Sequence, residues 1–330
     1  MKRFIKNNNF FNRGEQILSE ENKEWKINFE TLKSPLLFIF IFYGIAIWRY
    51  LATGEIFYVF NFVYLGTSLS IGIFLSQALP KKNVFWSRRI TQLLIGIYML
   101  GYLGFIRSEN MQIEGFFYYL FSGIFASATL HYFIAKIVGP IIFNRGWCGW
   151  ACWTAMVLDF LPWKKVRGRK KDLGVFRYVH FFLSMGLISL LWFGFRNKSL
   201  FSNAKIELYW LAVGNISYYI IGIILAYKLK DNRAFCKYVC PIPVFQKLTS
   251  RYSLLKIEID EEKCIECNLC EKNCPMGIKL LKYKNEGERV LSTECILCNT
   301  CVESCPENAI DVTKAFDRNK GKEYLYFEDK

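Results

Sequence analysis

Eight cysteines in the C-terminal part of the chain form two copies of one pattern, and this repeat constrains the fold more than any other feature. CIECNLCEKNCP begins at Cys264 and CILCNTCVESCP begins 31 residues later at Cys295, so both copies read C-x2-C-x2-C-x3-C-P. A cubane [4Fe-4S] cluster needs four thiolates, and in such a repeat three close cysteines bind one cluster while the fourth binds the other. Zinc is a poor alternative, because zinc sites use paired cysteine elements and four ligands in total.

The eight cysteines therefore divide into two predicted ligand sets: Cys264, Cys267, Cys270 and Cys305 for the first cluster, and Cys295, Cys298, Cys301 and Cys274 for the second. This region resembles the bacterial two-cluster ferredoxins over about residues 257–312. The resemblance implies a small α+β domain with short strands at Glu258–Asp260 and Ile310–Val312. A disulfide framework is not favoured, since disulfides belong to small secreted domains and oxidising compartments.

Upstream of the repeat the chain has the composition of a membrane protein. Hydrophobic residues make up 53% of the sequence, and six apolar segments have roughly the length of about 17–25 residues that spans a bilayer. The predicted spans are Pro35–Ala52, Ile56–Leu79, Ile90–Ile106, Gly115–Val138, Gly174–Phe195 and Leu208–Tyr227. We predict an N-terminal segment (1–34), a helical membrane bundle (35–255), a ferredoxin domain (256–312) and a C-terminal tail (313–330).

The positive charges give this bundle an orientation. The formal net charge is +15, and the excess lies in the N-terminal segment and in the loops around Lys81–Arg89 and Lys164–Lys171. Positive loops face the cytoplasm, so we expect both termini and the ferredoxin domain on the cytoplasmic side of the inner membrane. No apolar core of a secretory signal precedes Leu36. A nucleic-acid partner is not expected, because the excess does not lie on a soluble domain.

Four further cysteines form two C-x3-C pairs at the predicted cytoplasmic edge of the membrane. Cys148 and Cys152 lie in RGWCGWACW after the fourth span, and Cys236 and Cys240 lie in RAFCKYVCP after the sixth. Residues i and i+4 share one helical face, so each pair offers two thiolates. Together the pairs would complete a four-thiolate site, which favours a third [4Fe-4S] cluster. Packed core cysteines, a zinc clamp and a reversible dithiol switch remain open.

With these pairs ahead of a two-cluster ferredoxin, the chain resembles the NapH-type membrane ferredoxins and their NosR and CcoG relatives over about residues 139–312. The resemblance lies in CGWAC with Asp159 downstream and in FCKYVCPIPVFQKLTSRYSLLKI. Two features differ: Trp153 stands where the family usually has proline, and the first two spans are additional. The resemblance implies electron exchange between the membrane quinone pool and a redox partner protein.

Other functions for the same cysteines are metal (copper) reduction or assembly and redox sensing. The two histidines, His131 in the fourth span and His180 in the fifth, are expected at similar depth toward the cytoplasm. Hydrogen bonding within the bundle is favoured for both, ahead of contact with a quinone, and haem ligation is disfavoured. The sequence contains no phosphate-binding glycine loop, nucleophile triad or dinucleotide fingerprint. It therefore predicts no catalytic residue and indicates an electron-transfer subunit of an oxidoreductase system.

Overall fold

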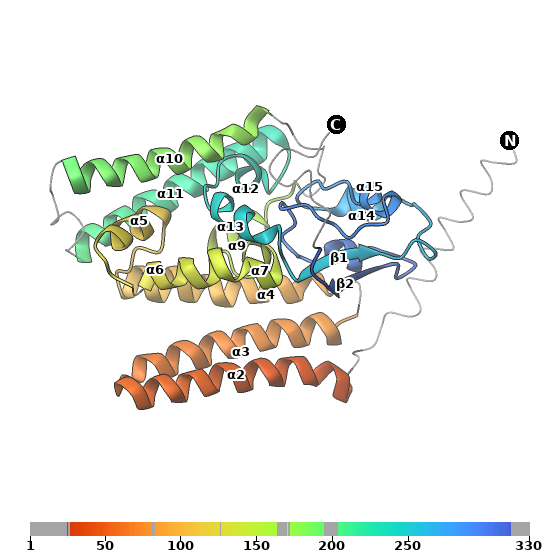
Figure 1. Ribbon diagram of the computed structural model, residues 1–330, viewed down its shortest axis with the longest axis horizontal. Coiled ribbons are helices and arrows are strands. Elements are labelled where there is room, and N and C mark those ends of the chain that lie inside the picture. Colours follow the sequence, from red (N-terminus) through yellow and green to blue (C-terminus); the bar gives the residue numbers. More distant parts are fainter. Residues whose placement is uncertain are drawn as a thin grey trace, which may run out of the picture.

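The computed structural model describes residues 25, 27–80, 83–125, 127–163, 170, 172–194 and 204–317. Long helices lie side by side in a bundle, and a small α+β region containing β1, β2, α14 and α15 packs at one end of it (Figure 1). The helices of the bundle and of the segments at its end are α2 (Phe29–Thr53), α3 (Ile56–Ala78), α4 (Phe85–Gly96), η1 (Ile97–Ile106), α5 (Ile113–Phe121), α6 (Ser127–Tyr132), η2 (Phe133–Val138), α7 (Pro140–Phe143), α8 (Gly146–Trp150), α9 (Trp153–Leu158), η3 (Asp172–Val175), α10 (Phe176–Ser189), η4 (Leu190–Gly194), α11 (Ala204–Leu229), α12 (Ala234–Tyr238) and α13 (Pro243–Ser250).

Among the described residues, five helices are long and apolar enough to cross a membrane: Phe29–Thr53, Ile56–Ala78, Phe85–Ile106, Leu173–Gly194 and Ala204–Leu229. Their outward faces carry large apolar side chains, such as Phe40 at 78% exposure and Leu51 at 77%. A helix hydrogen-bonds its own backbone, so such faces can lie against lipid. The chain is a multi-pass membrane protein, and the predicted fold class is confirmed.

The predicted fourth span differs from a single crossing helix. Its region divides into α5, a turn at Gly123 with φ of 70°, and a shorter apolar helix over Ala128–Phe143. The polar segment before α5, which lies between the third and fourth predicted spans, is buried at Asn110 and Gln112. Gln112 packs against Gly214 in α11 and lines a cavity that it shares with Tyr132 and Tyr218. Irregular backbone is tolerated at membrane depth when protein surrounds it, so this segment folds back into the bundle.

The third span also begins earlier than predicted, at Phe85 rather than Ile90. Arg88 and Arg89, interpreted as loop charges, lie inside α4, where Arg88 is 8% exposed. An ion pair with Asp159 makes this burial tolerable. Most of the remaining charges used for orientation, in residues 1–24, 81–82 and 164–169, lie outside the described residues, so the orientation remains a prediction.

The two additional N-terminal helices form a hairpin that joins the bundle through α3. A Cβ added at Gly66 would lie 2.5 Å from Cβ of Phe42, and one added at Gly72 would lie 1.9 Å from Oγ1 of Thr91. Glycine thus permits α3 to approach α2 on one side and α4 on the other. Tyr64 of α3 stacks on Tyr98 of η1, with ring centroids 4.7 Å apart.

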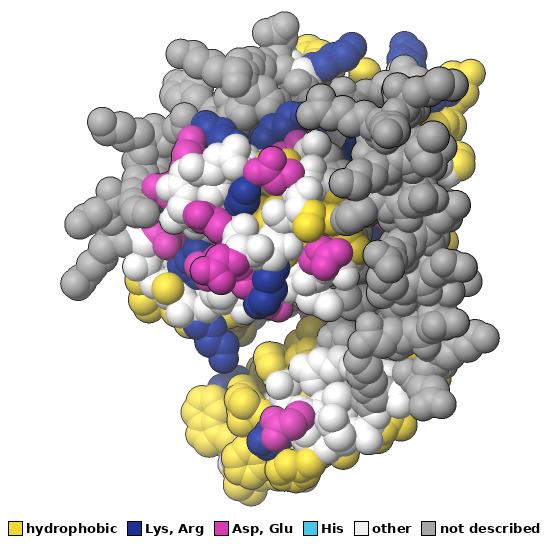
Figure 2. Space-filling view, turned by 90° about the vertical axis from the view of Figure 1, so that its right-hand side faces the viewer, with side chains coloured by type: hydrophobic (Ala, Val, Ile, Leu, Met, Phe, Trp, Pro, Cys, Tyr) yellow, Lys and Arg dark blue, Asp and Glu magenta, His cyan; other side chains and the backbone are white. Residues whose placement is uncertain are grey.

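The α+β region begins with β1 (Leu255–Ile259) and ends with β2 (Ile310–Lys314), which pair antiparallel from Leu255↔Lys314 to Ile259↔Ile310. Between them lie α14 (Leu269–Asn273), α15 (Leu280–Asn285) and α16 (Thr300–Glu303). The predicted flanking strands are confirmed and are slightly longer than expected. Figure 2 shows this end of the molecule, where acidic and basic side chains are interspersed over the α+β region.

The two cysteine motifs repeat in backbone conformation as well as in sequence. Left-handed backbone occurs at matching positions, 31 residues apart: Glu266 and Leu297, Asn268 and Asn299, Gly277 and Asn308. Such residues turn the loop sharply. Each motif therefore curls into the same concave loop around its cysteines.

Candidate iron–sulfur sites

The second concave loop encloses a cavity that includes a cysteine from the first motif. A cavity of about 20 Å³ is lined by Cys274 together with Cys295, Cys298 and Cys301. Cys274 follows α14, and the other three belong to the loop before and within α16. This is the grouping expected when the fourth cysteine of one motif crosses to the loop of the other.

The fourth cysteine of each motif is held in an equivalent way. The Cys274 sulfur accepts a hydrogen bond from the Ile278 backbone N–H at 3.4 Å, and the Cys305 sulfur accepts one from Ala309 at 3.3 Å. Sulfur atoms held this way are oriented before any ligand binds. Exposure differs between the motifs, since Cys267 is exposed while Cys295, Cys298 and Cys301 are buried.

The two membrane-edge cysteine pairs converge on a second, larger cavity. It measures about 40 Å³, and its lining includes Cys148, Cys152, Cys236 and Cys240. The prediction that both cysteines of each pair lie on one helical face is wrong. Cys148 and Cys236 lie in the five-residue helices α8 and α12, but Cys152 has extended backbone before α9 and Cys240 follows the end of α12. Each second cysteine reaches the cavity because the chain leaves the helix there.

The side chains around this cavity fit a group that carries negative charge and accepts hydrogen bonds. Two residues that line the cavity each have a buried side-chain nitrogen without a hydrogen-bond acceptor among the described residues: Gln112 Nε2 and Arg145 Nε. Buried donors are normally satisfied, and the sulfurs of an iron–sulfur cluster are acceptors of this kind. Burial raises the pKa of Cys236 to about 12, although Arg233 opposes the shift. Bound metal would supply the positive charge that ionises such thiols.

Within the part of the chain that the structure describes, no three His, Cys, Asp or Glu side chains converge closely enough to hold one metal ion. The four cysteines nonetheless line one cavity.

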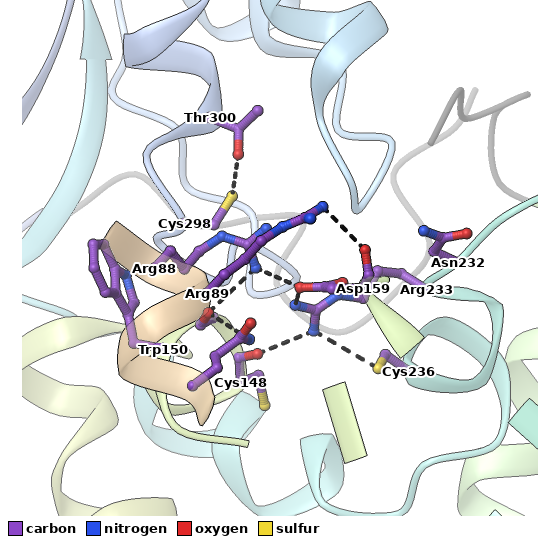
Figure 3. A network of polar contacts seen from close by, with 12 residues as sticks. Arg88, Arg89, Cys148, Trp150, Asp159, Asn232, Arg233, Cys236, Cys298 and Thr300 are labelled. Carbon is purple, nitrogen blue, oxygen red and sulfur yellow. Dashed lines mark hydrogen bonds and ion pairs between the residues drawn. The ribbon is translucent and has the colours of Figure 1, made fainter. Parts of the chain in front are cut away.

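A buried carboxylate ties the two membrane-edge elements together. Asp159, which follows α9, accepts hydrogen bonds at 2.6 Å from Arg88 and from both Nε and Nη2 of Arg233 (Figure 3). Burial acts to raise the pKa of Asp159, but the two arginines outweigh it and hold the pKa well below its usual range. Arg233 also donates to the Cys148 carbonyl oxygen at 3.0 Å. One arginine thus connects both cysteine pairs.

A second buried carboxylate ties the α+β region to the bundle. Glu294 directly precedes Cys295, and its oxygens contact Arg145 at 2.5 Å, Arg177 at 2.8 Å and Lys247 at 2.5 Å. Arg145 stands three residues before Cys148. The ion pairs therefore bridge the cysteine loop of the second motif and the first membrane-edge element.

Backbone contacts bring the same two segments even closer. A Cβ added at Gly149 would lie 2.3 Å from the Ile296 carbonyl oxygen, so only glycine fits. Trp150 Nε1 donates to the Leu297 carbonyl oxygen at 2.8 Å. Cys148 belongs to the same buried apolar cluster as the ferredoxin cysteines. The membrane-edge cavity and the second ferredoxin loop are thus direct neighbours.

Comparisons with known proteins match two parts of the chain to 4Fe-4S families. Residues 256–306 match the family of 4Fe-4S dicluster domains, and residues 126–173 and 218–259 match a 4Fe-4S binding domain family. Over 199 residues the chain is 31% identical to the uncharacterized protein MJ0749 of Methanocaldococcus jannaschii, covering 58% of this chain and 75% of that protein. The chain belongs to the same family of ferredoxin-type iron–sulfur membrane proteins.

Two bacterial relatives of this ferredoxin-type membrane protein have descriptive names. It is 27% identical to the putative electron transport protein YccM of Escherichia coli over 172 residues, or 47% of this chain and 48% of YccM. It is also 27% identical to the methylamine utilization ferredoxin-type protein MauN of Methylobacillus flagellatus, over 47% of this chain and 58% of MauN. The matches thus span about half the length of each.

A further relative matches a short stretch of the chain. Over 62 residues the chain is 36% identical to one component of the ion-translocating oxidoreductase complex of Buchnera aphidicola, which is 17% of this chain and 13% of that component. No solved structure matches the chain. The matched families show that this membrane protein binds [4Fe-4S] clusters, two or more in number.

The two histidines lie beside different cysteine elements. The His131 ring is 4.6 Å from the ring of Trp147, which precedes Cys148. His180 Nδ1 lies 3.0 Å from the carbonyl oxygen of Val239, which precedes Cys240, and its Nε2 lies 3.4 Å from the hydroxyl of Tyr218. Each histidine thus supports one cysteine element through the preceding residue.

Trp153, which replaces the usual proline after Cys152, fits its position. It is the first residue of α9, where proline and other residues are both tolerated because that N–H has no helical partner. Its Nε1 donates to Asn215 of α11 at 3.0 Å. The tryptophan therefore anchors the first cysteine element to the bundle.

Sequence reasoning missed the buried charges as functional residues. Arg145 and Arg233 each stand three residues before the first cysteine of their element, an R-x2-C spacing that both elements share. That repeated spacing was the available signal. Nothing comparable in the sequence marks Glu294 or Arg177, whose partners lie far along the chain.

Proposed function

We propose that the protein passes electrons between the quinone pool or a membrane partner and a redox partner protein through three [4Fe-4S] clusters. Cys148, Cys152, Cys236 and Cys240 hold the membrane-edge cluster. The ferredoxin clusters use the two predicted ligand sets, with Cys274 and Cys305 crossing between loops. The observation that carries the proposal is the packing of Gly149 and Trp150 on the loop that contains Cys295. This contact supports a relay from the membrane edge into the ferredoxin region.

Burial gives the relay an order. The second ferredoxin set is buried against the bundle, whereas the first set includes exposed Cys267. Electrons therefore pass between the membrane-edge cluster and the Cys295 loop, then to the cluster near Cys267. A partner protein docks at that outer cluster, where its own cofactor can approach.

The quinone end of the relay lies beside the membrane-edge cavity. Tyr132 and Tyr218 line that cavity, and Tyr218 is adjacent to His180. These groups provide hydrogen bonds for a quinone head group that enters between the helices. Positive loops support the cytoplasmic placement of the relay. A cytoplasm-dependent reporter fused after Lys330 should be active, and one inserted at Asn203 should be inactive.

Quinol-driven reduction tests the proposal. Anaerobically purified full-length protein is mixed with a reduced menaquinone or ubiquinone analogue, and cluster reduction is followed by EPR. We expect the quinol to reduce clusters in the intact protein and to fail in a Cys148→Ser/Cys236→Ser variant. Equal reduction of both proteins would contradict a relay through the membrane edge.

Cluster ligation has its own test. If the fourth cysteine crosses between loops, Cys274→Ser should disturb the same EPR signal as Cys298→Ser, and Cys270→Ser should disturb the other. Grouping of Cys274 with Cys270 would overturn the proposed ligand sets.

A further inference from the structure

Among the described residues, one buried cation of the bundle lacks the carboxylate partner that every comparable cation has. Lys136 lies in η2, within the apolar helix Ala128–Phe143, and is 3% exposed. Buried cations with a carboxylate within ion-pair distance are Arg88, Arg145, Arg177, Arg233, Arg289, Lys237, Lys247 and Lys256. No carboxylate of the described residues lies within that distance of Lys136. A buried charge without a counter-charge is strongly unfavourable.

The surroundings of Lys136 show where its counter-charge must come from. Its Nζ lies 4.3 Å from the centroid of the Trp147 ring, an interaction that only partly replaces an ion pair. Lys136 also lines the membrane-edge cavity, and Cys148, Cys152 and Cys240 are close enough to act on its ammonium group electrostatically. The nearest groups that can carry negative charge are therefore thiolates.

A local irregularity of the helix places the lysine there. Residues Phe133–Val138 form a π-helical turn, in which hydrogen bonds join residues five apart, as from Gly139 N–H to the Ile134 carbonyl oxygen. His131 and Lys136, which are five apart, both contact Trp147. In a regular α-helix these positions would point in different directions. Such π-helical turns occur frequently at functional sites.

We propose that Lys136 is the counter-cation of the membrane-edge [4Fe-4S] cluster and raises its reduction potential. The inference rests on the proposed function, because it requires the four cysteines to hold a cluster. The cluster takes up one electron from its donor and gains one negative charge, while Lys136 keeps its proton. A fixed positive charge nearby stabilises the reduced state more than the oxidised state. The lysine acts on the cluster through its charge and is not one of the cluster ligands.

The test is an EPR-monitored redox titration of anaerobically purified full-length protein. Lys136→Met removes the charge, Lys136→Arg keeps it, and Lys228→Met, at an exposed position of α11, serves as the matched control. We expect the methionine variant to lower the equilibrium constant for reduction of one cluster by about tenfold or more. For one electron, each tenfold change lowers the reduction potential by about 59 mV. The arginine and control variants should keep the wild-type potentials, and both ferredoxin clusters should be unchanged in all proteins.

Iron content separates the failure of this inference from the failure of the proposed function. Loss of roughly four irons per chain in Lys136→Met but not in Lys136→Arg also supports a counter-cation. Loss in both variants would indicate a packing role and overturn the inference, as would full iron content with unchanged potentials. Wild-type protein with roughly eight irons would refute the membrane-edge cluster itself.

Discussion

The ferredoxin loops and the membrane-edge site both gather four cysteines, but they do so by different means. In the ferredoxin region each loop carries its own left-handed turns, as at Asn268 and Asn299, and closes around neighbouring cysteines. At the membrane edge the two pairs come from distant parts of the chain and meet through Asp159 and Arg233. One site is shaped by local backbone, and the other is assembled by buried charge.

This difference has a consequence for how each site fails. Loops shaped by their own backbone should retain their clusters when the bundle is disturbed. A site assembled by ion pairs should be lost when one partner is removed, because the remaining charge stays buried without compensation. Substitutions at the buried charges should therefore affect the two sites differently.

The largest effect is expected for Asp159→Asn. It leaves Arg88 and Arg233 buried without their carboxylate, at a cost of about 3–5 kcal/mol in the free energy of unfolding of the bundle. The membrane-edge site should lose its iron while the ferredoxin clusters remain, as measured by iron analysis and EPR. Asp311→Asn, at an exposed position, is the control and should change neither. Retention of the full iron complement would show that the charges do not assemble the site.

Glu294→Gln tests the connection between the two regions. The variant leaves Arg145, Arg177 and Lys247 without a carboxylate, but glutamine still accepts hydrogen bonds, so we expect a cost of about 3 kcal/mol. Both sites should keep their iron, whereas quinol-driven reduction of the ferredoxin clusters should slow by at least about tenfold. Exposed Glu307→Gln should behave as wild type. An unchanged rate would mean that Glu294 does not control how the ferredoxin region docks on the bundle.

Gly149→Ala tests the close approach itself. The added methyl group would overlap the Ile296 carbonyl oxygen, and overpacking of this kind costs about 2 kcal/mol. The rate of ferredoxin reduction should fall, with cluster EPR spectra unchanged. Gly186→Ala is matched to it, since a Cβ there meets nothing within 4 Å. The same rate of ferredoxin reduction in both variants would show that electron transfer does not depend on this contact.

The smallest effect is expected within the ferredoxin region at Asp317. Burial acts to raise its pKa, but hydrogen bonds from Arg289 and Lys256 outweigh this and lower the pKa. The ionised carboxylate therefore stabilises the fold above the ordinary aspartate pKa, and this contribution disappears as the pH falls through the lowered value. Asp317→Asn should cost about 1 kcal/mol at pH 7, measured by chemical denaturation, and progressively less in acid. A cost independent of pH would rule out this ion pair as its origin.

The features that sequence could predict are those encoded locally. The eight ferredoxin cysteines, the two short strands that flank them and five of the apolar helices follow from spacing, hydropathy and the ferredoxin resemblance. Asn110 and Gln112 are polar and lie between two predicted spans, yet tertiary packing buries them. Arg88 and Glu294 gained their roles only from partners distant in sequence. Charge pairing across the fold leaves no periodic signal in one sequence.

Iron and acid-labile sulfide analysis of the intact protein tests most directly whether the four membrane-edge cysteines hold a cluster. Wild-type protein and the Cys148→Ser/Cys236→Ser variant are purified anaerobically in parallel. We predict roughly 12 irons per chain in the wild type and roughly 8 in the variant, with matching sulfide. Roughly 8 irons in both proteins, with no other metal present, would contradict the membrane-edge cluster.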